Sequence, residues 1–472
     1  MKVAIVSSRI VGIAFVFTFM TACSFTPEYV RPEVSMPANF KEISSDWQPA
    51  KPADQLTRGQ WWTAFQDPTL NDLVEKANAN NFQIAAAVAR YDSSRAFVAV
   101  NNAGLYPQVG AFAGASENRQ SVGRPLRGAN QPNIYDNNQF GGAATYELDL
   151  WGRVRSSINS ASALSQASEA ELESVRLIVT ADLVTSYIAM RGVESQIQIL
   201  NSDLDLYQKQ ANLMQLRFKE GINSGADFYR LQSLVEAGKA KESDLKTRRA
   251  QLEHVIALLT GVPASNFSLP VEGMSKLVMP PIALQIPSTL LERRPDIAAA
   301  ERRVAASNED IGVAKSAYFP VISLGALGGY QTANQANILA APNAFWTIGP
   351  MAFLTIFDGG RRAAIVDQAV AKNAENTAIY KNTVLGAIKE VEDILADIRD
   401  RQAAYLNVEN NAVFASKTYS ISVARYQQGI ASYLEIVDAA IDQSKAKTTQ
   451  ISYQEQLLID RVLLIKALGG YW

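Results

Sequence analysis

Residues able to do chemistry are scarce in this 472-residue chain, which contains one histidine, His254, and one cysteine, Cys23. A zinc site needs several such side chains together, and a cysteine–histidine dyad would need a free Cys23, which is expected to carry a lipid, so both kinds of site are excluded. His254 falls in a helical pattern and its neighbour Glu253 belongs to a different face, which favours a structural histidine. A carboxylate-only active site stays open, but no glycine-rich phosphate loop accompanies it. We therefore expect no enzyme, no catalytic residues, no metal site and no cofactor.

Cys23 has a different expected role, because it ends an export signal. Lys2 and Arg9 accompany a short apolar run that closes with Thr-Ala-Cys. This order is typical of a bacterial lipoprotein, in which the signal peptide, residues 1–22, is removed and Cys23 receives a covalent lipid. Ser24, rather than aspartate, follows Cys23. That residue favours sorting to the outer membrane.

The charge and hydropathy of the chain exclude other classes. The 44 basic and 46 acidic residues are mixed and give a net charge of −2, and no basic run could neutralise a phosphate backbone. A nucleic-acid partner is therefore not expected. After the signal no stretch offers the 18 apolar residues of a membrane helix, so any crossing of a bilayer would be made by strands.

A repeated motif shows that the chain contains two copies of one plan. An arginine, an aromatic residue and a glycine recur 425 − 217 = 208 positions apart, as Arg217, Phe218 and Gly221 and again as Arg425, Tyr426 and Gly429. Upstream, the segments 84–90 and 297–303 match at an offset of 213, so the first copy has the longer loop between its strands. Each copy is expected to form a helix, two strands, a very long helix, a tight turn and a returning helix.

The long helices are predicted at about 153–220 and 361–428. Neither segment contains proline, and apolar residues recur at alternating spacings of three and four, as in a coiled coil. Returning helices are predicted at about 226–260 and 433–468. Shorter helices, at about 70–104 and 290–317, have the right length to stack end to end on the returning helices.

The strand candidates are weaker, because their apolar alternation is imperfect. They lie at about 108–117, 138–150, 320–331 and 344–357 and carry the glycines and aromatic residues expected of membrane strands. Four antiparallel strands cannot close a barrel, and an open edge is not viable in lipid. Three chains would supply twelve strands, a workable barrel, so the need to close the sheet predicts that the chain forms an oligomer.

These patterns divide the chain into five parts. Residues 1–22 are the signal peptide, and 23–68 form a proline-rich, lipid-anchored extended arm with an equatorial segment. Residues 69–261 are the first repeat, with a β-hairpin at about 108–150 and a tip turn near 221. Residues 262–289, rich in proline, form a belt. Residues 290–472 are the second repeat, with a hairpin at about 320–357 and a tip turn near 429.

Five stretches together carry a family resemblance: CSFTPEYVRPEV, WWTAFQDPTLNDLV, LLERRPDIAAAERRVAASNEDIGVAKSAYFP, FDGGRR and RYQQG. The chain resembles the TolC-type outer-membrane factors, specifically the lipoprotein branch (NodT/OprM-like) of resistance-nodulation-division efflux systems. The resemblance implies an α+β membrane protein: a trimeric twelve-stranded transmembrane β-barrel, with four strands per chain, continued by a periplasmic α-helical coiled-coil barrel with a mixed belt. It implies a gated passive exit duct of a tripartite efflux pump, with a periplasmic adaptor, an inner-membrane pump and outer-membrane lipid as partners.

The resemblance also assigns roles at the periplasmic tips. Family members close this end with inward-pointing side chains just past the turn, which in this chain are Leu434 and Asp438, four apart on one helical face, with Glu435 nearby. The first repeat departs from this pattern, because Arg230 stands where the second has Asp438, and an Arg230–Asp438 contact could lock the closed state. The residues expected to contact the adaptor are Arg217, Phe218, Gly221, Arg425, Tyr426 and Gly429.

Two other functions stay open at this point. Within the duct interpretation, service to a type I protein-secretion system is possible. A lipoprotein coiled coil that bridges membranes without conducting anything is the second, but such an adaptor would not need the glycine- and aromatic-rich strand pair of each repeat.

Overall fold

The computed structural model describes residues 24–42, 60–125, 128, 130–222, 224–280 and 293–470. The expected signal peptide and the lipidated Cys23 lie outside these ranges. Among the helices so described, none has both the length and the apolar character required to cross a membrane.

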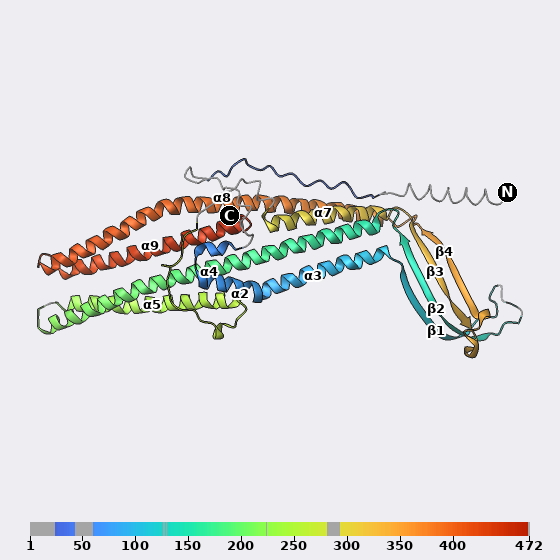
Figure 1. Cartoon of the computed structure of the whole chain (residues 1–472), viewed down its shortest axis with the longest axis horizontal. Helices are drawn as coiled ribbons and strands as arrows, with labels where there is room; N and C mark the ends of the chain where they lie inside the picture. Colours follow the sequence, from blue (N-terminus) through green and yellow to red (C-terminus); the bar gives the residue numbers. More distant parts are fainter. Residues whose placement is uncertain are drawn as a thin grey trace. The chain divides into compact units, whose positions relative to one another are not determined.

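Four strands form one antiparallel sheet in the order β1-β2-β3-β4 (Figure 1). They are β1 Gln108–Arg119, β2 Ile134–Leu148, β3 Val321–Thr332 and β4 Ala344–Phe353. Glycine pairs permit the close approach of β2 and β3: a Cβ on Gly141 would lie 2.8 Å from the Cα of its partner Gly329. Within one chain, β1 and β4 each pair with one neighbour, so the sheet has two open edges.

The helices confirm the predicted repeat. The long helices α4 Arg153–Lys219 and α8 Arg361–Gln427 have 67 residues each, and the returning helices α5 Gly225–Leu259 and α9 Tyr433–Ala467 have 35 each. The predicted bounds agree to within one residue. The remaining described helical segments are the helices α2 Pro68–Asn80, α3 Phe82–Asn102 and α7 Pro295–Ser316 and the short turns η1 Trp61–Phe65, η2 Ala103–Leu105, η3 Ala264–Asn266, η5 Gln335–Asn337 and η6 Ala341–Asn343.

The single helix predicted at 70–104 is wrong. The segment forms α2 Pro68–Asn80 and then α3, because Asn81 between them has an extended backbone and caps the second helix. Its Oδ1 accepts hydrogen bonds from the backbone N–H groups of Gln83 (2.8 Å) and Ile84 (3.1 Å). The Asn81 side chain thus satisfies two backbone N–H groups at the start of α3. A new helix begins there, although the apolar pattern of the sequence continues without a break.

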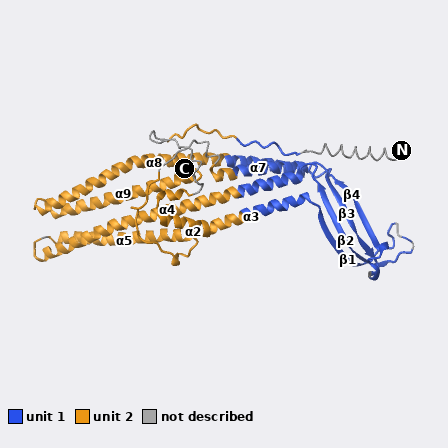
Figure 2. Ribbon diagram, viewed as in Figure 1, with its two compact units in different colours: residues 1–32, 91–168, 300–380 blue, residues 33–90, 169–299, 381–472 orange. Residues whose placement is uncertain are grey.

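The chain divides into two compact units, and each combines segments of both repeats (Figure 2). Unit 1 contains residues 1–32, 91–168 and 300–380, including the sheet. Unit 2 contains residues 33–90, 169–299 and 381–472, including both returning helices and both tip turns. The boundaries of the five parts proposed from the sequence stay a prediction.

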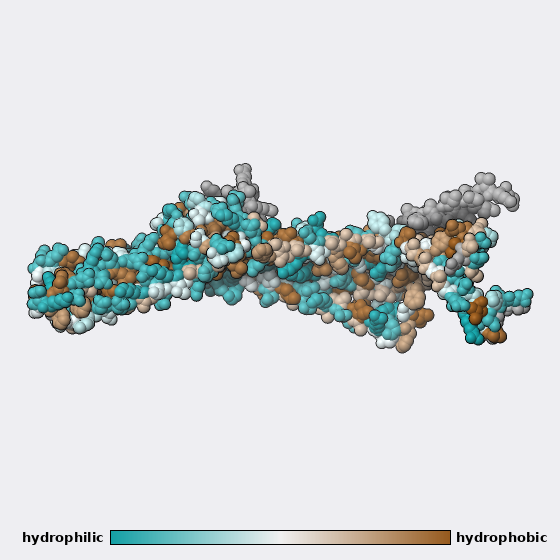
Figure 3. All heavy atoms as spheres, turned by 90° about the horizontal axis from the view of Figure 1, so that it is seen from below, coloured by the Kyte–Doolittle hydropathy of each residue, from teal (hydrophilic) through white to brown (hydrophobic). Residues whose placement is uncertain are grey.

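The core of unit 2 contains the apolar residues that recur at spacings of three and four along α4 and α8. Ile197, Leu200, Tyr207, Ala211 and Met214 are buried on α4, and Val384, Val391, Leu395 and Ile398 are buried on α8. Other large apolar side chains remain at the surface among hydrophilic ones, as the face in Figure 3 shows. On β4 the exposed set is Trp346, Ile348, Met351 and Phe353. Because side chains alternate along a strand, Trp346 and Ile348 lie on one face of β4 and Met351 and Phe353 on the other. Exposed apolar side chains are expected of membrane strands.

Candidate functional site: the hairpin tips

The two tip turns have the same backbone geometry. Gly221 and Gly429 have φ values of +71° and +73°, the left-handed conformation that glycine adopts without steric cost. In each turn the residue after the glycine donates to the carbonyl five positions back, Ile222 to Arg217 at 2.8 Å and Ile430 to Arg425 at 2.9 Å. This is the Schellman arrangement, which satisfies the last carbonyls of α4 and α8. Both isoleucine side chains are about two-thirds exposed.

A hydrogen bond between the ends of α4 and α8 joins the two hairpins at the tips. Arg217 Nη1 of α4 donates a 2.6 Å hydrogen bond to the Tyr426 hydroxyl of α8. The Tyr426 ring in turn packs edge-on against Tyr433 of α9, with ring centroids 5.6 Å apart. Phe218, by contrast, lies against Gly225 of its own hairpin, where an added Cβ would be 3.0 Å from its ring. Of the predicted adaptor-contacting residues, Arg217 and Tyr426 therefore already have a role within the chain.

The predicted contact between Arg230 and Asp438 is present. Arg230 Nη2 of α5 lies 2.6 Å from Asp438 Oδ1 of α9, and both side chains are about half exposed. Close by, Arg425 Nη1 lies 2.7 Å from Glu435 Oε1. Exposed ion pairs of this kind contribute little to folding, on the order of 0–1 kcal/mol. The two ion pairs instead orient the charged side chains that face away from the core of the hairpins.

Leu434 and Asp438 lie on the outer face of α9, as the four-residue spacing predicts. Leu434 is 40% exposed, whereas the intervening Ile436 and Val437 are buried. The buried face joins a cluster that draws on α4, α5 and α9: Ala211, Met214, Leu231, Tyr433, Ile436 and Val437. This cluster packs the tips of both hairpins against each other, so the exposed face of α9 lies over a well-packed core.

The residues considered for chemistry stay apart from the tips. His254 is exposed on α5, and Glu253 points elsewhere, because its Oε1 accepts a 2.7 Å hydrogen bond from the Leu269 N–H. Within the described ranges, histidine, cysteine and acidic side chains do not gather into a group of three that could hold a metal ion.

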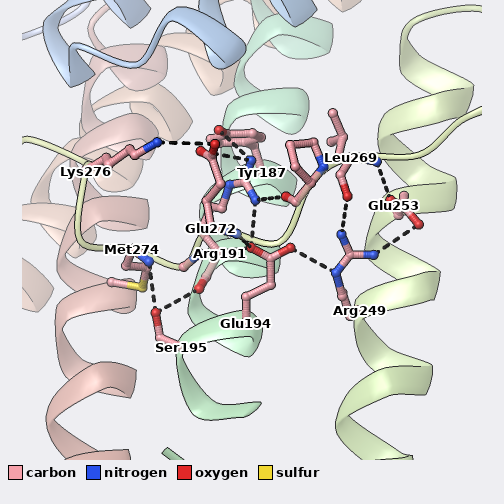
Figure 4. Close-up of polar contacts among 12 residues, drawn as sticks. Tyr187, Arg191, Glu194, Ser195, Arg249, Glu253, Leu269, Glu272, Met274 and Lys276 are labelled. Atoms are coloured by element: carbon pink, nitrogen blue, oxygen red, sulfur yellow. Dashed lines mark hydrogen bonds and ion pairs between the residues drawn. The ribbon is translucent and has the colours of Figure 1, made fainter. Parts of the chain in front are cut away.

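Sequence reasoning missed a buried ion network that binds residues 269–276 of the proline-rich segment to α4 and α5 (Figure 4). Arg191 and Glu194 are both fully buried on α4, and their side chains meet at 2.7 Å. Arg249 of α5 completes the pair, with its Nε 2.9 Å from Glu194 Oε1. The three charges together join two helices.

Backbone groups of the same segment complete this network. The Glu194 carboxylate accepts from the N–H groups of Glu272 (3.0 Å) and Gly273 (3.1 Å), and Arg191 Nη1 donates to the Pro270 carbonyl at 2.7 Å. The hydrogen bonds from Arg191 and from these amides hold the pKa of Glu194 below its usual range against the opposing effect of burial. An Arg-x-x-Glu pair inside an apolar stretch of α4 was the available signal.

A second buried acid also escaped the sequence reasoning. Glu455 of α9 is 4% exposed and lies against Gly192 of α4, where an added Cβ would be 2.7 Å from the carboxyl carbon. Burial raises the pKa of Glu455 to about 7, with a partial opposing effect of Arg248. Nothing in the local sequence of α9 distinguishes Glu455 from the exposed acids around it.

Comparison with known proteins agrees with this architecture. The family model described as outer membrane efflux protein matches residues 73–262 and 286–470, one segment for each repeat. The chain is 30% identical over 474 residues to the toluene efflux pump outer membrane protein TtgC of Pseudomonas putida, covering 99% of this chain and 96% of the relative. It is also 30% identical over 455 residues to the outer membrane protein OprJ of Pseudomonas aeruginosa, covering 96% and 93%.

Solved structures show the same fold. The outer-membrane channel OprN superimposes with a TM-score of 0.86 at 28% identity, covering 95% of this chain and all of that one. The open state of the MtrE outer membrane channel of Neisseria gonorrhoeae gives 0.83 at 25% identity, covering 95% and 98%. The expected fold class and the outer-membrane efflux function are confirmed at this level. With matches that span both repeats and nearly its whole length, this chain belongs to the outer membrane efflux protein family.

Proposed function

We propose that three copies of this chain form a gated, passive exit duct for drugs or other small molecules, which crosses the outer membrane and extends into the periplasm. One observation carries the proposal: the four-stranded sheet has an open edge at β1 and another at β4. Unsatisfied strand edges are not viable in lipid, so β4 of one copy must pair with β1 of the next until the ring closes. Twelve strands form a barrel of workable size.

The tips supply the gate in this proposal. Leu434 and Asp438 face away from the hairpin core, so three copies present an apolar ring and a carboxylate ring around the threefold axis. The apolar ring narrows and dewets the passage, and the carboxylates favour cations when it leaks. The Arg230–Asp438 pair holds this arrangement closed.

The tip turns are the proposed docking surface for the periplasmic adaptor. Gly221 and Gly429 end the two hairpins, and each is followed by an exposed isoleucine, Ile222 or Ile430. An inner-membrane pump supplies the energy. Relatives carry names such as toluene efflux pump protein and antibiotic efflux pump protein, which supports small-molecule cargo for this chain. A lipid on Cys23 anchors the mature N-terminus in the outer membrane.

Two measurements on the purified protein test the proposal together. Light scattering in detergent is expected to give the mass of a trimer, and planar-bilayer recordings are expected to show small, cation-favouring currents. A monomer without conductance would overturn the duct and favour the non-conducting adaptor. Export of a polypeptide, but not of small molecules, by cells that depend on this chain would instead favour type I secretion.

A further inference from the structure

The two hairpins of one chain meet along an antiparallel seam of α4 and α9 within unit 2. Near the tips this seam is apolar, since Met214 and Tyr433 share one cluster and Tyr207 and Ala440 share the next. In each pair of facing residues along this seam, the number of the α4 residue and the number of the α9 residue sum to 647 or 648, as for Met214 and Tyr433. The seam is therefore regular, and its side chains can be compared level by level.

Above the apolar levels the seam becomes polar. Asp203 accepts a hydrogen bond from the Ser444 hydroxyl, and Gln196 Nε2 donates to Ser452 Oγ at 3.4 Å. One level further, Glu455 is 4% exposed opposite Gly192. The absence of a side chain at Gly192 makes the space that the carboxyl occupies. At three levels of the seam polar groups thus replace apolar packing, and the last of them holds a buried acid.

The Glu455 carboxyl has no hydrogen bond or ion pair with any residue that the structure describes. Arg248 of α5 acts on Glu455 only at a distance. The other charged groups around the seam are Arg191 with Glu194 on α4, Asp397 with Arg401 on α8 and Asp460 on α9, and Lys241 and Lys447 near Asp203.

A buried carboxyl without a partner favours its neutral form, because an uncompensated charge in an apolar setting is costly. The burial of Glu455 accordingly raises its pKa to about 7. Asp203, the other acid of the seam, also has its pKa raised by burial, but the Ser444 hydrogen bond opposes that rise. Separation of α4 and α9 at the Gly192 level would return an ionised Glu455 to water.

We propose that the polar levels of the α4–α9 seam form a proton-dependent joint: Glu455 is neutral while the hairpins are packed and ionises as they move apart. The joint loosens as the pH rises through neutrality. Its role is to make the packing of the two hairpins respond to the pH of the compartment. The proposal concerns packing within one chain and does not rest on conduction.

Hydrogen–deuterium exchange of the assembled, full-length protein tests this joint. Amides of residues 192–203 and 444–455 are compared at about pH 5.5 and about pH 8.5 after correction for intrinsic exchange, and the opening equilibrium is expected to rise with pH by up to about thirtyfold. Glu455→Gln keeps the shape of the side chain and removes the titration, so its exchange is expected to lose this pH dependence. The matched control Glu409→Gln, an exposed acid on α8, is expected to keep it.

Three results would overturn the joint. They are a wild-type seam whose corrected exchange does not change with pH, a Glu455→Gln protein that keeps the wild-type change, and an Asp203→Asn protein that alone loses it. The first result requires no variant, so a folding defect in Glu455→Gln does not protect the proposal. Bilayer currents recorded from the same samples address the duct separately, since a silent protein with a pH-dependent seam contradicts the duct and leaves the joint intact.

Discussion

Asn81 and Arg294 occupy equivalent positions of the two repeats and make the same bond to equivalent carbonyls. Asn81 Nδ2 donates to Leu259 O and Arg294 Nη1 to Ala467 O, each at 2.9 Å. The donors are 294 − 81 = 213 residues apart and the acceptors 467 − 259 = 208, the two offsets of the repeat. In both repeats a side chain at the start of one helix therefore closes the end of a returning helix, which joins α5 to α3 and α9 to α7.

Glycine makes these two junctions possible, and substitution there is expected to be costly. Gly261 has a φ of +73°, and a Cβ added to it would lie 2.5 Å from the Asn80 carbonyl oxygen. Gly261→Ala combines a left-handed backbone with a backbone collision and should destabilise the protein by about 3 kcal/mol or more. Thermal unfolding of the assembled protein measures this loss.

Gly221→Ala is the matched control for that substitution. Gly221 has a similar φ of +71°, but an added Cβ meets nothing within 4 Å. It should therefore cost only the backbone term of about 1–2 kcal/mol. Equal losses in the two variants would show that the approach of Asn80 to Gly261 is not a tight junction.

The buried network of α4 is expected to be sensitive to the loss of one charge. Glu194→Gln leaves Arg191 and part of Arg249 without their carboxylate in a fully buried site, and should cost about 3 kcal/mol. Glu173→Gln breaks a surface pair with Arg176 and should cost under about 0.5 kcal/mol. Chemical denaturation of the two variants gives the comparison, and similar losses would refute the view that burial decides the effect.

Acid should release the segment that this network holds. The folded-state pKa of Glu194 is lowered, so its contribution to stability is present above about pH 4.5 and is lost as the pH falls through the folded value. Limited proteolysis within residues 262–280 is expected to accelerate in that range. Glu194→Gln should show fast cleavage at every pH, and an acid step that persists in this variant would assign the release to another group.

How much of this could be predicted from the sequence depends on the range of the interactions. Helices α4 and α8 were predicted to within a residue, because heptad spacing and the glycine of the tip turn are local signals. The break at Asn81 was missed, because one side chain cap outweighs a continuous apolar pattern. Glu455 and Glu194 were missed for a different reason: their burial depends on helices that are far apart in sequence.

Of the two contacts between side chains of the hairpin tips, the sequence predicted one and missed the other, again because of the range of the interactions. The Arg230–Asp438 contact followed from comparing equivalent positions of the two repeats, which local spacing makes possible. The bond of Arg217 to Tyr426 was not predicted, although both residues were named, because it requires the two hairpin ends to lie at the same level.

The closed tip should depend on Arg230 and Asp438 as a pair. Their exposed contact contributes under about 1 kcal/mol to folding, so Arg230→Ala and Asp438→Ala should leave thermal stability nearly unchanged. If the pair holds the hairpins closed, each variant should raise single-channel conductance several-fold, and the double variant should add little, because the second substitution removes a partner that is already lost. Asp205→Ala, which breaks an exposed α4 pair with Lys209, is the control and should conduct like the wild type. Additive effects of Arg230→Ala and Asp438→Ala would mean that the two residues act on the passage separately, and unchanged conductance in both would place the constriction elsewhere on the tips.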